Sequence, residues 1–326
     1  MHRSYLYLTA LVCLLYSYAC APKNTLEPVL APITVQLAWT HQSQFAGLYA
    51  ADQMGYYAEE GLQVTFIEGG TKVDKLAPVL NGTAQFGVAS PDELIIARSN
   101  GNRLKAFSTI FRLNPVVFVS LKDKNITIPQ QFIGKTIRAS ANTAPTLNAM
   151  MARLGISIDQ YSYVDTPSDI EMFSSGEIPV WGIYRNAMLV AIQKAGYPVN
   201  IIYPDDYGVH FYSDSLYTTD EIINNDPQLV QRFLKASLKG WKFAVENPQR
   251  IPEFVQIYNP DADLQIERDR MIATIPMVNT GEDNIGWMTP EVWFEMEKTL
   301  RDQNLITAPV DVTQVFTMNF LEEIYK

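Results

Sequence analysis

Strand-like and helix-like segments alternate along the first two thirds of the chain, and this limits the possible fold more than any other feature. Short runs rich in β-branched and aromatic residues are separated by amphipathic segments of roughly ten residues. Strands separated by helices of this length form βαβ units, in which neighbouring strands run parallel. The sequence therefore predicts an α/β protein. The expected strands are residues 33–39, 64–68, 86–89, 116–121, 136–140, 162–164, 180–183 and 201–203.

Helix-capping signals support this interpretation. Ser90 and Glu93 form a capping box, which predicts a helix directly after the third strand. Near the last third of the chain, Asp226 and Pro227 predict another helix start, and an apolar stripe at helical spacing follows to residue 246. The last third of the chain is therefore expected to be mainly helical.

The length of the chain allows two lobes of ordinary domain size. A polar stretch at residues 122–125 interrupts the alternating pattern, and we expect the chain to pass there to a second lobe. The expected first lobe is residues 33–121 together with 215–326, and the expected second lobe is residues 122–214.

The chain begins with a leader, residues 1–20. Its apolar stretch, residues 6–15, suits a signal peptide and is too short for a membrane span, which needs roughly 20 apolar residues. Small Ala19 precedes Cys20, and this end resembles that of a lipoprotein signal peptide. We therefore expect Cys20 to be lipidated; the alternatives are ordinary cleavage near Ala21 or a retained signal anchor.

An anchor of this kind fits the cysteine count. Cys13 and Cys20 are the two cysteines of the sequence, so no internal disulfide is expected after cleavage. Residues 21–32 contain several prolines and read as a tether. The expected location is the extracytoplasmic face of the cell membrane, with the lipid as anchor.

Charge and aromatic content narrow the class of partner. The net charge of −10 argues against nucleic acid, which would require a basic patch. The 17 Tyr and 5 Trp residues either serve packing alone or include a stacking site for a flat ligand. No metal or other cofactor is expected.

Ligands of open α/β sheets bind beyond the carboxyl ends of the strands, where helix N-termini present free N–H groups. Four such strand ends, at residues 39–44, 90–93, 142–143 and 181–185, are expected to converge on one cleft. The candidate ligand-binding residues are Trp39, His41, Gln42, Gln44, Tyr49, Ser90, Asp92, Glu93, Asn142, Thr143, Trp181, Tyr184, Arg185 and Tyr207.

The aromatic candidates each have a packing alternative. Trp39 is the preferred stacking residue, and the alternative is a core tryptophan. Trp181 and Tyr184 are expected as cleft aromatics and Tyr207 as a cleft wall, whereas Tyr49 is expected to be half core and half cleft.

The polar candidates also have ordinary alternatives. His41 either donates to or stacks on a ring, or is a solvated loop residue. The amides of Gln42 and Gln44 suit the hydrogen-bonding edge of a ring such as a pyrimidine-dione. Arg185 has a salt bridge as its alternative. Helix capping is the alternative for the remaining polar candidates, which are Ser90, Asp92, Glu93, Asn142 and Thr143.

Several motifs resemble the NMT1/THI5-like branch of the periplasmic binding proteins over residues 33–320. They are W-T-H-Q-S-Q-F-A-G-L-Y-A-A from Trp39, G-Y-Y-A-E-E-G-L from Gly55, E-G-G from Glu68, G-V-A-S from Gly87 and D-Y-G-V from Asp206. The resemblance implies a two-lobed α/β fold, the type 2 periplasmic-binding-protein (Venus flytrap) fold, with the ligand between the lobes. It also implies a binding protein that delivers a vitamin-related heterocycle to the permease and ATPase of an ABC importer.

Within this family the resemblance points first to riboflavin. Binders of thiamine pyrimidine precursors typically carry W-x-P-N after the first strand, whereas this chain has W-T-H-Q from Trp39. The number of expected cleft aromatics also favours a tricyclic ring. A formylaminopyrimidine-like precursor of thiamine is the alternative ligand.

Two further functions remain as alternatives. One branch of the family synthesises the thiamine pyrimidine with a cysteine-rich motif, iron and an active-site histidine. After Cys20 this chain has no cysteine, and His41 and His210 are its two histidines beyond the leader, so an enzyme is not expected. Binding proteins of this fold also feed sensor receptors, a role that the sequence alone does not distinguish from import.

Overall fold

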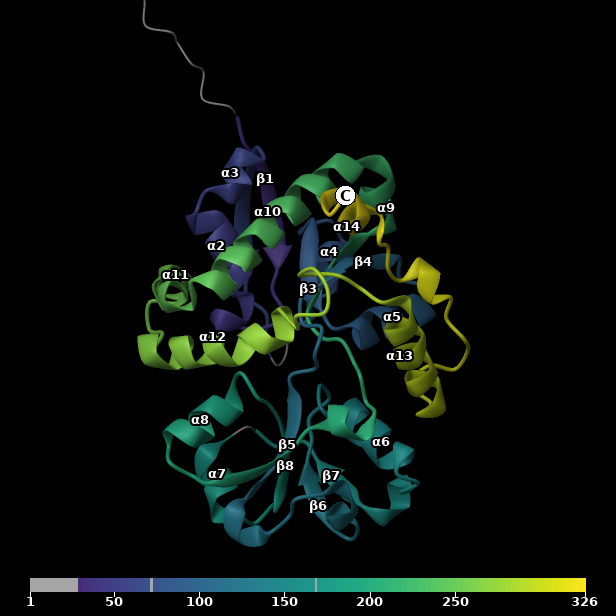
Figure 1. The fold of residues 1–326 in the computed structure, drawn as a ribbon. Helices are drawn as coiled ribbons and strands as arrows, with labels where there is room; N and C mark the ends of the chain where they lie inside the picture. The colour runs from purple at the N-terminus through teal and green to yellow at the C-terminus, as the bar shows by residue number, and fades with distance from the viewer. Residues whose placement is uncertain (1–28, 71–72, 168) are drawn as a thin grey trace, which may run out of the picture. The chain divides into compact units, whose positions relative to one another are not determined.

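The computed structural model describes residues 29–70, 73–167 and 169–326, and every structural statement below concerns those residues (Figure 1). Ala31–Lys326 forms one compact unit. The leader, Cys20 and all of the tether before Val29 lie outside the described residues. Within those residues, no helix combines the length and the apolar composition that crossing a bilayer requires.

The first sheet has five strands in the order β2-β1-β3-β10-β4. β1 (Ala31–Gln36) pairs in parallel with the edge strand β2 (Leu62–Ile67) on one side and with β3 (Phe86–Ala89) on the other. β10 (Ser215–Thr219) runs antiparallel between β3 and β4 (Leu104–Thr109). Because β1, β2 and β3 are parallel, their carboxyl ends lie at one edge, and the loops after them share that edge.

The second sheet also has five strands, in the order β7-β6-β8-β5-β9. β6 (Thr136–Arg138) pairs in parallel with β7 (Ser162–Val164) and β8 (Val180–Tyr184). β5 (Val116–Leu121) pairs antiparallel with β8 and with β9 (Val199–Ile202). We call the first sheet with its helices lobe 1 and the second sheet with its helices lobe 2, so the predicted two-lobed α/β fold is confirmed.

One predicted boundary differs from the structure. Residues 116–121 form a strand as expected, but this strand lies in the second sheet and not in the first. The chain therefore crosses between lobes after Thr109 rather than after Leu121. A buried strand has the same apolar pattern in either sheet, so the pattern alone could not show which sheet this strand joins.

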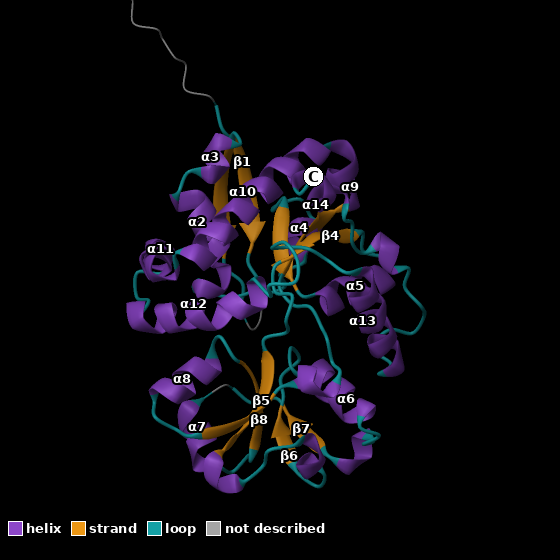
Figure 2. Ribbon diagram, in the orientation of Figure 1, coloured by secondary structure: helices purple, strands orange, loops and turns teal. Residues whose placement is uncertain are grey.

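Helices cover both sheets (Figure 2). In lobe 2 they are α6 (Ala144–Arg153), α7 (Ile170–Ser175) and α8 (Met188–Lys194), with α6 drawn on the opposite side of the sheet from α7 and α8. The helices of lobe 1 are α2 (Ala46–Gln53), α3 (Tyr56–Glu59), α4 (Ala77–Leu80), α5 (Pro91–Ser99), α9 (Asp220–Asn225), α10 (Pro227–Glu246), α11 (Ile251–Tyr258), α12 (Leu264–Val278), α13 (Pro290–Asp302) and α14 (Asn319–Ile324). The short 3-10 helices are η1 (Ser43–Phe45), η2 (Lys122–Lys124), η3 (Pro129–Phe132), η4 (Ile158–Gln160), η5 (Pro204–Tyr207), η6 (Pro248–Arg250) and η7 (Val312–Gln314).

The long helix α10 packs on α2 through two glycines. A Cβ atom on Gly240 would lie 2.1 Å from the carbonyl oxygen of Gly47 and 2.7 Å from the backbone nitrogen of Ala51. A Cβ atom on Gly47 would lie 2.1 Å from the ring of Trp241. The two helix backbones thus approach closely, and this contact fixes α2, the helix that follows the first loop of the candidate site.

Candidate functional site

The loop after β1 is fixed against the loop after β2. The side-chain amide of Gln36 donates to the backbone oxygens of Leu37 at 3.0 Å and of Glu68 at 3.1 Å. The backbone N–H of Gly69 donates to the oxygen of Trp39 at 3.0 Å, and a Cβ on Gly69 would lie 2.5 Å from the Leu37 oxygen. Trp39, in this loop, is partly exposed and also packs against the hydrophobic core, so both of its expected roles stay open.

His41 is held by an aromatic cluster of lobe 1. Its ring Nδ1 shares a hydrogen bond of 2.7 Å with the Tyr49 hydroxyl, and its ring stacks on Tyr258 at 5.5 Å between centroids. Its backbone N–H donates to the carboxylate of Glu68 at 2.7 Å. Burial lowers the pKa of His41, and the negative charge of Glu68 opposes this shift.

Tyr49 does not reach the cleft. Its side chain is fully buried, and it stacks on Tyr258 at 4.5 Å and meets Phe66 edge-on at 5.5 Å. Burial raises the pKa of its hydroxyl well above the usual value. The expectation of a half-exposed Tyr49 is wrong, because α2 turns this side chain into the cluster with α11.

A chain of buried polar side chains lies at the end of β1. The side-chain amide of Gln42 donates to Gln44 Oε1 at 2.7 Å, and the amide of Gln44 donates to Asp214 Oδ2 at 2.7 Å. Asp214 lies just before β10, and its backbone oxygen accepts the N–H of Ile110 at 2.8 Å, so it joins the two segments that connect the lobes. The sequence analysis did not identify Asp214 as a candidate. Its position directly before an expected strand of the first sheet could have marked it as one.

Burial raises the pKa of Asp214 to about 6, although the Gln44 hydrogen bond and Lys75 act in the opposite direction. Lys75 in turn forms an ion pair of 2.8 Å with Glu93. Glu93 Oε2 accepts the backbone N–H of Ser90 at 3.1 Å and its hydroxyl at 2.9 Å, which is the expected capping box. Ser90 and Glu93 thus cap the start of α5, and Glu93 also forms the ion pair with Lys75.

The pKa values of two further candidate residues, Asp92 and Tyr184, are raised. The pKa of Asp92 is raised by burial and by Glu93. The pKa of the Tyr184 hydroxyl is raised mainly by burial, then by Asp214, Asp92 and Glu93. Tyr184, at the end of β8, is partly buried and packs against the main hydrophobic cluster of the protein.

Trp181, expected as a cleft aromatic, belongs to the core of lobe 2. It is fully buried, its ring meets Phe173 at 5.7 Å, and its Nε1–H donates to the oxygen of Ile178 at 3.0 Å. Side chains alternate along a strand, and Trp181 and Ile183 point to the face that packs in this cluster. The expectation is therefore wrong.

The other lobe 2 candidates lie apart from the polar chain. Thr143 is buried, and its hydroxyl accepts the backbone N–H of Ser140 at 2.9 Å, the ordinary role in a turn before a helix. Asn142 is exposed, and Tyr207 is partly buried at the end of η5. Among the described residues, no hydrogen bond joins these three side chains to Gln44 or its partners.

Helix α12 supplies site-supporting residues that the sequence did not reveal. Glu267 Oε2 accepts the backbone N–H of Ser43 at 2.6 Å and its hydroxyl at 2.8 Å, while Glu267 Oε1 accepts Arg270 Nη1 at 2.5 Å. One turn later, the Thr274 hydroxyl accepts the side-chain N–H of Asn186 from lobe 2 at 3.1 Å. These contacts hold η1 in place and connect the two lobes beside the polar chain.

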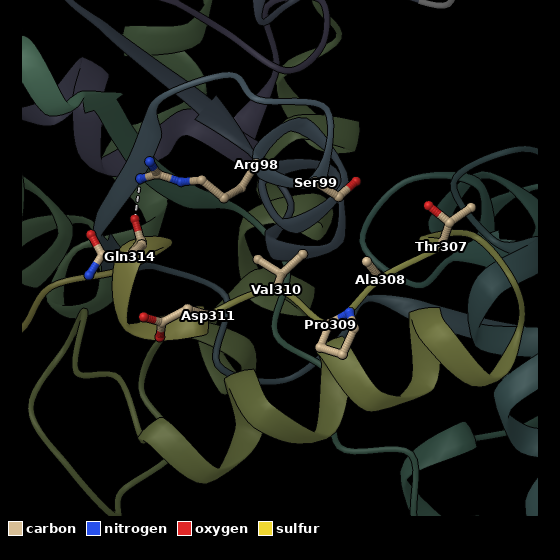
Figure 3. Close-up of a pocket in the computed structure, with 8 residues that line it drawn as sticks. All are labelled: Arg98, Ser99, Thr307, Ala308, Pro309, Val310, Asp311 and Gln314. Atoms are coloured by element: carbon tan, nitrogen blue, oxygen red, sulfur yellow. Dashed lines mark hydrogen bonds between the residues drawn. The ribbon is translucent and has the colours of Figure 1, made fainter.

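Two surface hollows lie away from this polar chain. One, of about 300 Å³, lies between α5 and residues 307–314, where Arg98 is already hydrogen-bonded to the Gln314 oxygen (Figure 3). It contains none of the candidate residues. The other, of about 490 Å³, lies between α8 and α12 and is lined by Arg185. In residues 29–70, 73–167 and 169–326, no group of three or more His, Cys, Asp and Glu side chains is arranged to hold a metal ion.

Known proteins share this fold and sequence pattern. The riboflavin-binding protein RibY of Chloroflexus aurantiacus is 24% identical over 92% of this chain and 89% of the relative. The formylaminopyrimidine-binding protein of Halalkalibacterium halodurans is 22% identical over 97% of this chain and 98% of the relative. The structure of the periplasmic aliphatic sulphonate binding protein SsuA from Escherichia coli has a TM-score of 0.71 at 12% identity, covering 87% of this chain and 91% of that one.

A further relative is an enzyme by name. The 4-amino-5-hydroxymethyl-2-methylpyrimidine phosphate synthase of Legionella pneumophila is 21% identical over 89% of this chain and 92% of the relative. The family model described as NMT1/THI5 like matches residues 42–251, well over half of the chain. The chain therefore belongs to the NMT1/THI5-like family and has the fold of a periplasmic binding protein.

Proposed function

We propose that the protein is the substrate-binding component of an ABC importer and that it holds a flat, hydrogen-bonding heterocycle between its lobes. The observation that carries this proposal is the polar chain Gln42–Gln44–Asp214, which ends at a segment that connects the two lobes. It lies at the carboxyl end of β1, where α/β sheets bind ligands. Both binding-protein relatives bind flat heterocycles, according to their names.

In this proposal each side chain has a distinct task. Trp39 stacks on the ring, because it is partly exposed on a loop that cannot move freely. Gln42 and Gln44 offer amide groups to the edge of the ring, and their mutual hydrogen bond orients both. Tyr184 of lobe 2 covers the other face of the ligand ring. Closure of the lobes around the ligand is then the conformation that the permease recognises.

Riboflavin is our preferred ligand, and a formylaminopyrimidine-like precursor of thiamine is the alternative. The RibY relative and the absence of W-x-P-N after β1 favour riboflavin. The number of aromatic residues available at the site supports riboflavin less strongly than the sequence suggests, since Trp181 and Tyr49 are buried away from the site. Trp39 and Tyr184 remain, and two aromatic faces suffice for one flat ring.

The location and partners follow from the same proposal. Residues 1–20 act as a lipoprotein signal peptide, Cys20 carries the lipid, and residues 21–32 tether the lobes to the extracytoplasmic face of the membrane. There the protein docks on a permease whose ATPase drives import. With the crossing after Thr109, the lobe division proposed from the structure is residues 31–109 with 215–326 for lobe 1, and residues 116–203 for lobe 2.

Synthesis of a thiamine pyrimidine is the alternative function, because the Legionella relative is named as a pyrimidine phosphate synthase. We propose binding rather than catalysis because His41 is hydrogen-bonded to Tyr49 and stacked on Tyr258, which leaves it fixed in a packing role. Iron in the purified protein, together with formation of a pyrimidine product, would contradict this proposal.

The site is tested with two variants of the protein lacking residues 1–20. Trp39→Ala is expected to weaken riboflavin binding about tenfold or more, because a stacked aromatic contributes about 1–3 kcal/mol. Trp287→Ala is the control, since this tryptophan packs against Tyr325 in lobe 1. Flavin fluorescence measures both affinities, and circular dichroism checks folding. Equal affinity of Trp39→Ala and the unmodified protein would show that the ring lies elsewhere.

A further inference from the structure

Asp214 lies beyond the carboxyl ends of two strands of the first sheet. β10 begins at Ser215, which pairs antiparallel with Ala89, the last residue of β3, so Asp214 lies level with the residue that follows β3. Its hydrogen bond of 2.7 Å with the Gln44 amide joins it to the loop after β1. Ligands of open α/β sheets bind at this edge of the sheet, and Asp214 is therefore positioned to contact one.

The carboxyl group of Asp214 has one engaged oxygen and one free oxygen. Oδ2 accepts the Gln44 amide, whereas Oδ1 has no hydrogen-bond partner among the described residues. Unlike the side-chain oxygen of Asn186, which is unpaired and fully covered, Asp214 Oδ1 keeps accessible surface, and Asp214 as a whole is 6% exposed. The free oxygen of this nearly buried carboxyl is thus still open to a ligand.

In the described part of the chain, no positive charge contacts this carboxyl. Lys75 acts on it electrostatically, but Lys75 Nζ forms its ion pair with Glu93 at 2.8 Å. The other ionisable groups nearby are acidic, namely Glu93 and Asp92 at the start of α5 and the hydroxyl of Tyr184. A buried carboxylate without a cation in contact is stabilised by further hydrogen bonds, so the free oxygen requires an N–H or O–H donor.

We infer that Asp214 is a further ligand-binding residue, whose Oδ1 accepts a hydrogen bond from an N–H group at the edge of the transported ring. The inference rests on the proposed function, because it places the ring between the lobes. It narrows the ligand to heterocycles that carry a ring N–H or an amino group at the bound edge. The N3–H of the riboflavin ring and the amino group of an aminopyrimidine both meet this requirement, whereas a ring edge with acceptors alone does not.

Ligand binding through this oxygen is coupled to a proton. Burial raises the pKa of Asp214 to about 6, so at that pH about half of the molecules carry a proton there. A donor from the ligand stabilises the ionised carboxyl and lowers its pKa, so binding near that pH releases a proton. The affinity should therefore rise with pH through this range by about fivefold, the advantage of a charged over a neutral acceptor.

Calorimetry with riboflavin tests this coupling on the protein lacking residues 1–20. Titrations at about pH 6, in buffers of different ionisation enthalpy, give the number of protons released per ligand. We expect the unmodified protein to release up to about half a proton, and Asp214→Asn, which cannot ionise, to release none. At about pH 7.5, Asp214→Asn should bind riboflavin about fivefold more weakly, and its affinity should no longer rise with pH.

Asp261→Asn is the matched control, because it makes the same chemical change at an exposed position between α11 and α12. This variant should keep both the proton release and the affinity of the unmodified protein. Equal proton release by the unmodified protein and by Asp214→Asn would overturn the inference.

N3-methylriboflavin removes the donor from the ligand instead. It should bind the unmodified protein about tenfold more weakly than riboflavin does and release no proton, because the buried acceptor is then left unpaired. In Asp214→Asn the loss on methylation should be smaller. Equal losses in the two proteins would show that the methyl group acts by its size alone and would contradict a hydrogen bond to Asp214.

Failure of riboflavin to bind would move the test to a formylated aminopyrimidine, whose amino group is an N–H donor. Proton release that depends on Asp214 would then support the inference with the alternative ligand. Binding of either heterocycle without that release would refute the inference and leave the proposed function standing. Failure of both heterocycles to bind would refute the proposed function and this inference together.

Discussion

Asp214 links the chemistry of the candidate site to the folding of the chain. Its carboxyl is buried, accepts the Gln44 amide at 2.7 Å, and lies where the chain returns to the first sheet. Lys75 and Glu93 also act on it electrostatically. A carboxyl in this position can present either an acceptor or, when protonated, a donor to a ligand.

The pKa of Asp214 gives a prediction about stability. Burial raises it from 3.8 to about 6, so the folded protein keeps a proton that the unfolded chain loses at lower pH. The free energy of unfolding contributed by this group therefore falls as the pH rises through that window, by about 2–3 kcal/mol. Asp214→Asn cannot ionise and should become more stable relative to the unmodified protein by this amount between pH 4 and pH 7.

Urea unfolding at several pH values measures this difference. Comparing the two proteins at each pH cancels the titration of the other carboxylates. Stability curves that stay parallel from pH 4 to pH 7 would show that Asp214 is not buried with a raised pKa.

At the residue scale, sequence reasoning failed for aromatic side chains inside strands and helices. The binding roles of Trp39, Gln42 and Gln44 stay predictions; in the structure Trp39 is partly exposed, and the two glutamines are hydrogen-bonded to each other. Trp181 is buried because strand alternation turns it to the packed face, and alternation cannot tell which face will be covered. Asp214 was missed because its partner, Gln44, is 170 positions away in the sequence.

At the element scale, the contact between α2 and α10 determines how the first loop of the site is supported. The start of α10 was predictable, since Asp226 accepts the backbone N–H of Leu229 as an N-cap residue does. Its close approach to α2 was not, because a glycine inside a helix pattern does not reveal what packs against it. Which sheet the strand at residues 116–121 joins was also unpredictable, because a buried strand has the same apolar pattern in either sheet.

Gly240→Ala tests this contact. Alanine favours a helix over glycine by about 1 kcal/mol, but its methyl group would lie 2.1 Å from the Gly47 oxygen. The clash with backbone should dominate and lower the free energy of unfolding by at least about 2 kcal/mol. Lys242→Ala, an exposed change on the same helix, should alter it by less than about 0.5 kcal/mol.

Urea denaturation distinguishes these two variants. A Gly240→Ala protein as stable as Lys242→Ala would mean that α2 and α10 lie farther apart than the structure shows.

At the scale of the whole folded unit, polar contacts join the lobes beside a hydrophobic cluster that has members in both. Asn186 of lobe 2 donates to Thr274 of lobe 1 at 3.1 Å, and Gln303 donates to the oxygen of Pro145 at 3.1 Å. Polar contacts between lobes contribute modest free energy, so a ligand that touches both lobes can shift their association. This is how the fold would convert binding into a signal for a permease.

Whether the protein binds a flavin is best tested by titrating riboflavin with the protein lacking residues 1–20 and following flavin fluorescence. We expect saturable quenching at one ligand per protein, and we expect neither iron nor nucleic acid to displace the ligand. An absence of quenching at any protein concentration, together with tight binding of a formylated aminopyrimidine, would contradict the flavin assignment and favour the alternative ligand.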